Sequence, residues 1–222
     1  MTMTDDEDQA ADDMFDDIWT LYFHDPFDVD WTTSSYVRLA DVSSSRDLKA
    51  IEYVLADKVA HGMFFLMREH VFPCWDDRYN IDGGCVSLKV PKNSVAGVWA
   101  GLCGLMVRER MVSSDRSRNE EMSGSSGGSE CDECDESEVC HDASVVNGLS
   151  VSPKSYYSIV KVWVSREVAD VRRFFRADVF PLEYQGDIIY KANREVISRA
   201  SQTAQAPKTS ARCRVLRAPD TV

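Results

Sequence analysis

The sequence predicts an α+β domain in which one face of a β-sheet carries three helices and the other face is open. Short segments that alternate between apolar and polar residues recur along the chain, which is typical of half-buried strands. Three well-separated segments instead place apolar residues at helical spacing. The strand segments follow one another in hairpin-like succession between these helices, which favours an α+β arrangement.

The first elements are two strands and a helix. Residues 18–23 and 36–39 are short runs of aromatic and aliphatic residues bounded by turn-forming residues. A helix then begins at Ser44 or Ser45, because serine is a favoured N-cap. Its apolar face comprises Leu48, Ile51, Leu55 and Val59. We expect it to end before Gly62, where a left-handed residue would terminate it.

Two strands and a second helix follow. Residues 63–67 form a short apolar run, and residues 86–90 alternate as a strand with one buried face does. Ser94 opens a helix with the apolar stripe Val95, Val98, Trp99, Leu102 and Met106. Three glycines interrupt it: Gly97, Gly101 and Gly104. They either permit close approach of another backbone or are tolerated weaknesses that each cost about 1 kcal/mol.

The C-terminal half contributes the remaining elements. Order resumes at residues 148–151, and residues 157–164 alternate strongly, which predicts a strand. A third helix is expected over residues 167–180, because Pro181 would end it. Its apolar stripe is Val168, Val171, Phe175 and Val179, and its solvated face carries Arg172, Arg173 and Arg176. Residues 187–191 are the last predicted strand.

One domain over residues 15–200 is expected, with three segments outside it. Residues 1–14 are acidic and nearly free of large side chains, so they predict a disordered tail. Residues 113–145 form a Ser-, Gly-, Asp- and Glu-rich insert, which lacks the apolar surface needed to order itself. Residues 201–222 are predicted to be a flexible basic tail.

The net charge of −12 is unevenly distributed. Residues 1–30 hold eleven acidic residues and no basic ones, and residues 113–142 hold ten acidic residues and two arginines. The rest of the chain is therefore basic. The acidic balance argues against broad, non-specific nucleic-acid binding, but it does not exclude an anionic ligand.

The composition points to a cytoplasmic protein. No run of about 18 apolar residues is present, so no membrane partner is expected. The acidic N-terminus lacks the pattern of a signal peptide, and the seven irregularly spaced cysteines are interpreted as free thiols in a reducing compartment.

Neither catalysis, a cofactor nor a metal site is expected. The four histidines are scattered, and the sequence contains no phosphate-binding loop and no Ser–His or Cys–His arrangement. Cys131 and Cys134 have zinc-ligand spacing. However, no second pair of this kind exists, and the adjacent Cys140 and His141 are awkward co-ligands.

The most distinctive stretch is the loop from Val71 to Gly84. In it Trp75 is followed at once by Asp76 and Asp77, between a proline and a double glycine. An aromatic face beside a carboxylate suits a flat, cationic ligand that donates hydrogen bonds. The alternative is an acidic turn anchored by a half-buried tryptophan.

Four blocks in order resemble the translation initiation factor 4E family, which binds the 5′ cap of messenger RNA. The first is Trp19-Thr20-Leu21-Tyr22-Phe23 with Trp31 after a short loop, and the second is Pro73-Cys74-Trp75-Asp76-Asp77 with Asn80 and Gly83-Gly84. The third is the helix at Trp99. The fourth runs from Gly148 to Lys154 and precedes Val162-Trp163.

The resemblance implies a curved antiparallel sheet with three α-helices on its convex face and the cap on its concave face. Trp31 and Trp75 would sandwich the cationic 7-methylguanine ring, each stacked face contributing on the order of 1–3 kcal/mol. Asp76 would accept its N–H donors, and Trp163 would contact the N7-methyl group. Lys154 would hold the cap phosphates.

The sequence departs from the family at the cap site. Asp76 stands where the family has a glutamate, one methylene longer. Tyr156 stands in place of a second phosphate-binding base, which Arg194 or Arg199 in a C-terminal loop could replace. Weaker cap binding than in a standard member is expected.

The sequence departs further at the dorsal face, where the family binds scaffold proteins of the initiation factor 4G type or regulatory proteins. Lys49 stands in place of a contact tryptophan. The other positions that align with this face include Trp99, Ala100, Gly101 and Gly104. Such divergence is similar to that of family variants in kinetoplastid protists.

Two functions remain open on the sequence. The first is a cap-binding factor that supports translation initiation. The second is a translational regulator that keeps the fold and sequesters partners, with weak or no cap binding.

Overall fold

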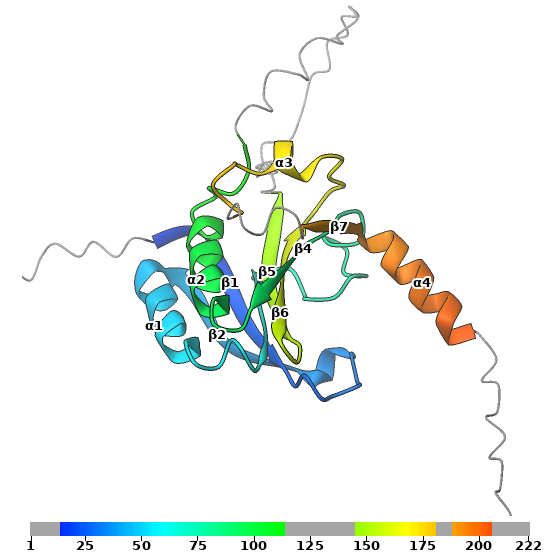
Figure 1. Cartoon of the computed structure of the whole chain (residues 1–222), viewed down its shortest axis with the longest axis horizontal. Coiled ribbons are helices and arrows are strands. Elements are labelled where there is room, and N and C mark those ends of the chain that lie inside the picture. The colour runs from blue at the N-terminus through cyan, green and yellow to red at the C-terminus, as the bar shows by residue number, and fades with distance from the viewer. Residues whose placement is uncertain (1–13, 114–144, 181–187, 206–222) are drawn as a thin grey trace, which may run out of the picture.

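The structure is a computed structural model that describes residues 14–113, 145–180 and 188–205 (Figure 1). In this part of the chain seven strands form one antiparallel sheet in the order β2-β1-β3-β5-β6-β4-β7. The strands are β1 (Met14–His24), β2 (Tyr36–Ser44), β3 (Met63–Arg68), β4 (Gly84–Pro91), β5 (Val146–Pro153), β6 (Tyr157–Val164) and β7 (Ile189–Ala192). The helices are α1 (Ser45–Leu55), α2 (Val95–Met106), α3 (Val171–Phe174) and α4 (Asn193–Gln205), with a 3₁₀ turn, η1 (Thr33–Ser35).

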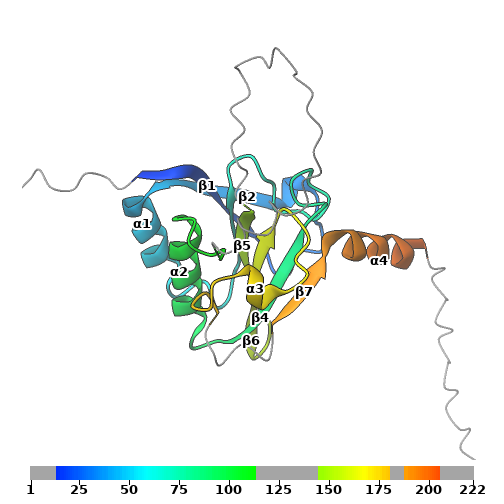
Figure 2. The same ribbon diagram turned by 90° about the horizontal axis from the view of Figure 1, so that it is seen from above.

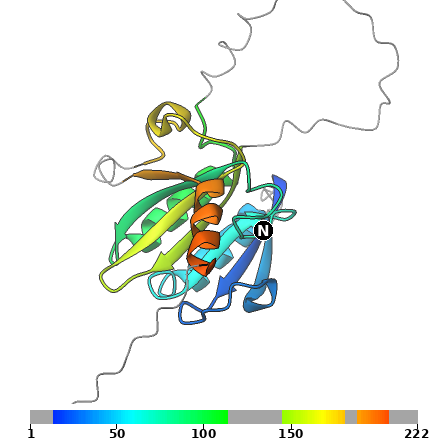
Figure 3. The same cartoon turned by 90° about the vertical axis from the view of Figure 1, so that its right-hand side faces the viewer.

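The two faces of the sheet have different coverings. Helices α1 and α2 pack side by side on one face, and α4 lies on the other side of the sheet (Figures 1 and 3). The main core fills the space between the sheet and α1 and α2. A smaller cluster lies apart from it and consists of Met63, Phe65, Met67, Val71, Cys85 and Trp163. The predicted α+β class and the curved antiparallel sheet are therefore confirmed.

Strand β6 shows how the alternating pattern separates the two faces. Ser158, Val160, Val162 and Val164 are completely buried on the side of the main core. Lys161 and Trp163 point to the opposite side, where Trp163 joins the smaller cluster. The alternation predicted from the sequence is confirmed, because successive side chains of a strand point to opposite faces.

The prediction of a long third helix over residues 167–180 is wrong. Residues 167–180 contain only the single turn α3, capped by Asp170, whose side chain accepts from the backbone N–H groups of Arg172 and Arg173. Phe174 and Phe175 are both buried, but the helical turn ends at Phe175, whose backbone is extended. Phe175 instead forms a β-bridge with Val112.

The C-terminal prediction is also corrected. Residues 193–205 form α4, although Arg194 and Arg199 were expected in a loop and the domain was expected to end at residue 200. The helix starts at the edge strand β7 and projects away from the domain (Figures 1 and 2). The predicted N-terminal tail, the insert with Cys131 and Cys134, and the last residues lie outside the described residues, apart from a few residues at the borders.

Helix α1 begins where the sequence indicates. Ser44 accepts a hydrogen bond from the Asp47 backbone N–H, and the Asp47 carboxylate accepts from the Ser44 backbone N–H, so a capping box is complete. The Asp47 carboxylate also accepts from the Ser43 backbone N–H at 3.1 Å, and this bond, together with those from Ser44, holds the pKa of Asp47 below its usual value. The prediction that a left-handed Gly62 ends this helix is wrong. The helix already ends at Leu55, and no described glycine has a positive φ.

The glycines of α2 do not permit a close approach within the chain. A Cβ atom at Gly97 or Gly101 would meet nothing within 4 Å in the part of the chain that the structure describes. The face of α2 that carries them is thus open.

Two smaller expectations can be compared with the described residues. Cys74, Cys85 and Cys103 are free thiols, as predicted. No described helix is long and apolar enough to cross a membrane.

Replacing Ser44 with alanine should lower the free energy of unfolding by about 1 kcal/mol, because the cap of α1 is lost. Ser94→Ala is the matched control, since Ser94 precedes α2 without a side-chain cap bond. Denaturant unfolding of both variants measures the difference. An equal loss in the two would contradict the role of the capping box.

Candidate functional site

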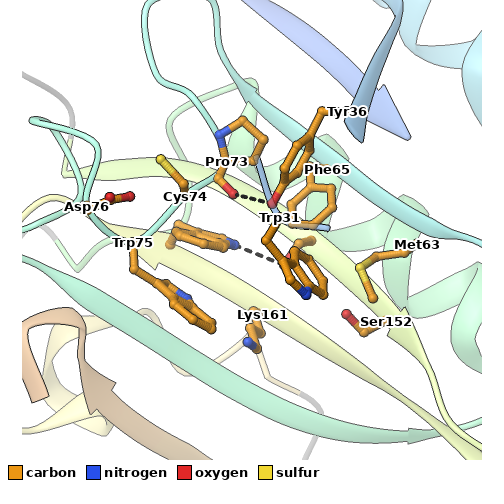
Figure 4. Close-up of a pocket in the computed structure, with 12 residues that line it drawn as sticks. Trp31, Tyr36, Met63, Phe65, Pro73, Cys74, Trp75, Asp76, Ser152 and Lys161 are labelled. Atoms are coloured by element: carbon orange, nitrogen blue, oxygen red, sulfur yellow. Dashed lines mark hydrogen bonds between the residues drawn. The ribbon is translucent and has the colours of Figure 1, made fainter. Parts of the chain in front are cut away.

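The open face of the sheet contains a pocket to which both loop tryptophans contribute (Figure 4). Trp31 comes from the β1–β2 loop and Trp75 from the β3–β4 loop, and in Figure 4 they lie on two sides of the pocket. Its lining is Trp31, Tyr36, Met63, Phe65, Pro73, Cys74, Trp75, Asp76, Ser150, Ser152, Lys161 and Trp163. The structure therefore brings together four predicted residues, Trp31, Trp75, Asp76 and Trp163.

Trp31 is held by a histidine on one of its faces. The rings of His24 and Trp31 stack at 4.2 Å between centroids with 7° between planes. His24 is completely buried, and its ring nitrogens lie 2.8 Å from the carbonyl oxygens of Asp25 and Asp30, which fix the ring plane. Trp31 remains 54% exposed, so a second flat group could stack on it.

Trp75 lies on a loop that a buried asparagine organises. The amide of Asn80 donates to the carbonyl oxygens of Phe72 (3.0 Å) and Cys74 (2.9 Å). Asp77 adds another hydrogen bond within the loop, because its carboxylate accepts from the backbone N–H of Tyr79 at 2.9 Å. The backbone on the N-terminal side of Trp75 is thus fixed, while its side chain is 38% exposed.

Two more asparagines connect this loop to distant segments. The Asn147 amide, from β5, donates to the Asn80 side-chain oxygen at 2.9 Å. The Asn193 amide, at the start of α4, donates to the Asn80 carbonyl at 2.7 Å. All three asparagines are buried, so the Trp75 loop, the sheet and α4 share one hydrogen-bond network.

Tyr36 connects the two tryptophan loops. Its ring makes edge contacts with His24 at 4.9 Å and with Phe72 at 5.0 Å between centroids. Its hydroxyl donates to the carbonyl oxygen of Pro73 at 3.3 Å. Burial raises the pKa of Tyr36, so the phenol stays protonated and keeps this donor at neutral pH.

The floor of the pocket is formed by β6. Trp163 is buried, and its indole N–H donates to the Ser150 hydroxyl on β5 at 2.9 Å. Lys161 lies two residues before it on the same face, with its ammonium 5.6 Å from the centroid of the Trp75 ring. Burial lowers the pKa of Lys161.

Asp76 supplies the carboxylate of the pocket, beside Cys74. Burial, together with the Asp76 carboxylate, raises the pKa of the Cys74 thiol to about 12. Cys74 is therefore a neutral thiol at physiological pH. The pocket thus offers aromatic faces, one carboxylate and one ammonium group to a ligand. No group of three His, Cys, Asp or Glu residues that could hold a metal occurs among the described residues.

Three predicted phosphate-binding residues lie away from this pocket. Lys154 lines a neighbouring pocket with Tyr156 and Phe27. Arg194 forms an ion pair with Asp82, and Arg199 lies 3.7 Å from Glu195 on α4. These arginines therefore have acidic neighbours of their own, because residues 193–205 fold into a helix and not a loop.

The predicted dorsal residues lie on α1 and α2, on the other side of the sheet from the pocket. Lys49 and Gly101 are exposed, and Ala100 and Gly104 are partly buried. Trp99 is 2% exposed and belongs to the main core. Its side chain therefore has almost no accessible surface on the predicted dorsal face.

Sequence reasoning did not single out Lys161, Tyr36 or His24. Lys161 could have been found, because it shares the alternation of β6 with Trp163. The contacts of Tyr36 and His24 join segments that are distant in the sequence, and no local pattern indicates them.

Comparison with known proteins decides the family. A sequence model of the family described as eukaryotic initiation factor 4E matches residues 14–208. The chain belongs to this family. A search of the curated proteins returned no match.

Solved structures of family members share the fold. A complex of C. elegans eIF4E-3 with the 4E-binding protein Mextli and cap analog is 13% identical, with a TM-score of 0.58, over 84% of this chain and 96% of that chain. Ascaris suum eIF4E-3 with m7G cap is also 13% identical, with a TM-score of 0.55, over 82% of this chain and 91% of that chain. At 13% identity, these likenesses show that the chain shares the fold of the two proteins.

Asn80→Ala should lower the free energy of unfolding by about 2 kcal/mol or more, because buried carbonyl groups lose their donor. Asn93→Ala is the control, since Asn93 is exposed. Chemical denaturation of both variants gives the comparison. If Asn80→Ala lowered the free energy of unfolding no more than Asn93→Ala does, the asparagine network would not be what stabilises the Trp75 loop.

Proposed function

We propose that the protein binds the 7-methylguanosine 5′ cap of messenger RNA in the pocket between Trp31 and Trp75, and thereby acts in translation initiation. The observation that carries the proposal is the convergence of two exposed tryptophans and a carboxylate on one pocket. Membership of the initiation factor 4E family supports it. The function is binding, with no catalytic step.

The chemistry of the methylated base matches these residues. N7-methylation makes guanine a planar cation, which an indole face attracts through its π-electrons. The free face of Trp31 and the ring of Trp75 supply two such surfaces, and Trp163 on the floor contacts the methyl group. The positive charge and the methyl contact together distinguish the methylated base from guanine.

Asp76 reads the other edge of the base. A carboxylate accepts the N1–H and N2–H donors of guanine in a charge-assisted pair. Asp76 lines the pocket beside Trp75, and its side chain is short. Its reach toward the base is thus limited.

The phosphates of the cap leave the pocket past the end of β5. Ser152 lines the pocket, and Lys154, two residues further on, lines the neighbouring pocket. Lys154 binds a phosphate there. Arg194 and Arg199 can bind a cap phosphate only if Arg194 leaves Asp82 and Arg199 leaves Glu195.

A second function shares the fold: a regulator that sequesters partners and binds the cap weakly. The cation Lys161 inside the pocket favours it over a strong cap binder. In both functions a scaffold protein of the initiation factor 4G type or a 4E-binding protein docks on α1 and α2. We assign Lys49, Ala100, Gly101 and Gly104 to that surface. The structurally similar C. elegans eIF4E-3 forms complexes with the 4E-binding protein Mextli.

Trp75→Ala should abolish retention of the protein on immobilised 7-methylguanosine triphosphate, because one stacked face on the order of 1–3 kcal/mol is lost. Tyr53→Ala is the control, since Tyr53 is an exposed aromatic residue of α1. Retention by the Trp75 variant equal to that of the wild type would show that the base binds elsewhere.

Asp76→Glu should preserve or raise the affinity for 7-methylguanosine triphosphate, because the carboxylate gains one methylene of reach. Asp76→Asn should lower the affinity, since the charge-assisted pair is lost. Isothermal titration calorimetry of both variants checks this prediction. A large drop with glutamate would exclude Asp76 as the group that reads the base.

A further inference from the structure

Lys161 places a positive charge inside the pocket. Its side chain projects from the floor strand β6, and its ammonium lies over the ring of Trp75, 5.6 Å from the centroid. In Figure 4 it lies between Trp75 and Trp31. This is the region in which the base would stack.

The charge of Lys161 has no carboxylate partner in the part of the chain that the structure describes. Asp76 lines the same pocket, but no ion pair joins the two side chains. The charged groups that act on Lys161 are Lys154 and Lys191, which have the same sign. Cys85 also lies near, but burial raises the pKa of its thiol to about 12, so it carries no charge at neutral pH. The interaction with the Trp75 ring is thus its only described compensation within the pocket.

An aromatic face that already attracts one cation is a poorer site for a second. A cationic base that stacks on Trp75 must displace the Lys161 ammonium or lie within a few ångströms of it, and either costs binding free energy. A neutral base is not repelled in this way.

We propose that Lys161 is a specificity-determining residue that occupies the cation position over Trp75 and weakens the preference of the pocket for a positively charged base. This inference rests on the proposed cap binding and refines it. It makes the pocket more tolerant of neutral guanine than one with an uncharged floor would be.

Another role for Lys161 would be to bind a cap phosphate. The surroundings of Lys161 favour a role at the base, over Trp75, and not at a phosphate. Lys161 lies two residues from Trp163 on the floor, opposite Ser150 of β5 in the sheet register, and between the two tryptophans that would hold the base. The phosphates extend away from the base, toward the neighbouring pocket that contains Lys154.

The test is calorimetric titration of the full chain with three ligands: 7-methylguanosine, guanosine and 7-methylguanosine triphosphate. Lys161→Met removes the charge and keeps the length of the side chain. Lys161→Arg keeps the charge. Lys89→Met is the matched control, because Lys89 also lies over an aromatic ring, that of Tyr157 at 4.6 Å, but outside the pocket lining.

Lys161→Met should tighten binding of 7-methylguanosine about tenfold, the order expected when one like charge a few ångströms away is removed. Binding of guanosine should change less than about twofold on the same grounds. The ratio of the two affinities should therefore rise, and Lys161→Arg and Lys89→Met should leave it unchanged.

Two results would overturn the assignment of Lys161 while leaving cap binding intact. One is unchanged or weaker binding of 7-methylguanosine by a folded Lys161→Met variant. The other is weaker binding of the triphosphate alone, which would make Lys161 a phosphate ligand. Absence of binding of any methylated ligand by the wild type and by Lys161→Met would overturn the proposed function and this inference together.

Discussion

A buried network of three asparagine amides fixes the geometry on which the pocket depends. Asn80 lies at its centre and holds the two carbonyl groups that precede Trp75. Asn147 and Asn193 reach it from β5 and from the start of α4. A loop is expected to be mobile at the surface, but buried and satisfied polar groups give this one a defined conformation. The exposed tryptophan is thereby carried by a rigid support.

Close packing of the backbone adds to this constraint. A Cβ atom at Gly83 would lie 1.7 Å from the carbonyl oxygen of Val164, so no other residue fits at the end of the loop without a backbone shift. The Asn193 backbone N–H donates to the Gly83 carbonyl at 2.9 Å. The glycine therefore lets the Trp75 loop lie directly against β6, whose Lys161 and Trp163 form the pocket floor.

Much of the fold follows from local patterns in the sequence. The alternation of β6 and the serine cap of α1 are local signals, and both are present in the structure. The exposure of Trp31 and Trp75 and the burial of Trp19 also follow from their positions in polar loops and on an apolar stripe. These features depend on neighbours within a few residues.

The errors arise where distant contacts decide the local structure. Residues 167–180 have helical spacing, but Phe175 forms a β-bridge with Val112, a residue more than 60 positions away that no local pattern indicates. Helix α4 has few large apolar residues, and its start is fixed by the hydrogen bond from Asn193 to the distant Asn80. The position of Lys161 over Trp75 likewise depends on how two strands and a loop meet in space.

The division of the tryptophans has a spectroscopic consequence. Trp19, Trp99 and Trp163 are at most 3% exposed, and the indole N–H groups of the first two have no hydrogen-bond partner in the described structure. Trp31 and Trp75 face solvent. Intrinsic fluorescence therefore combines a blue-shifted contribution from the core with a red-shifted one from the pocket. A soluble quencher that acts on the red edge of the emission would report on the pocket alone, without any label.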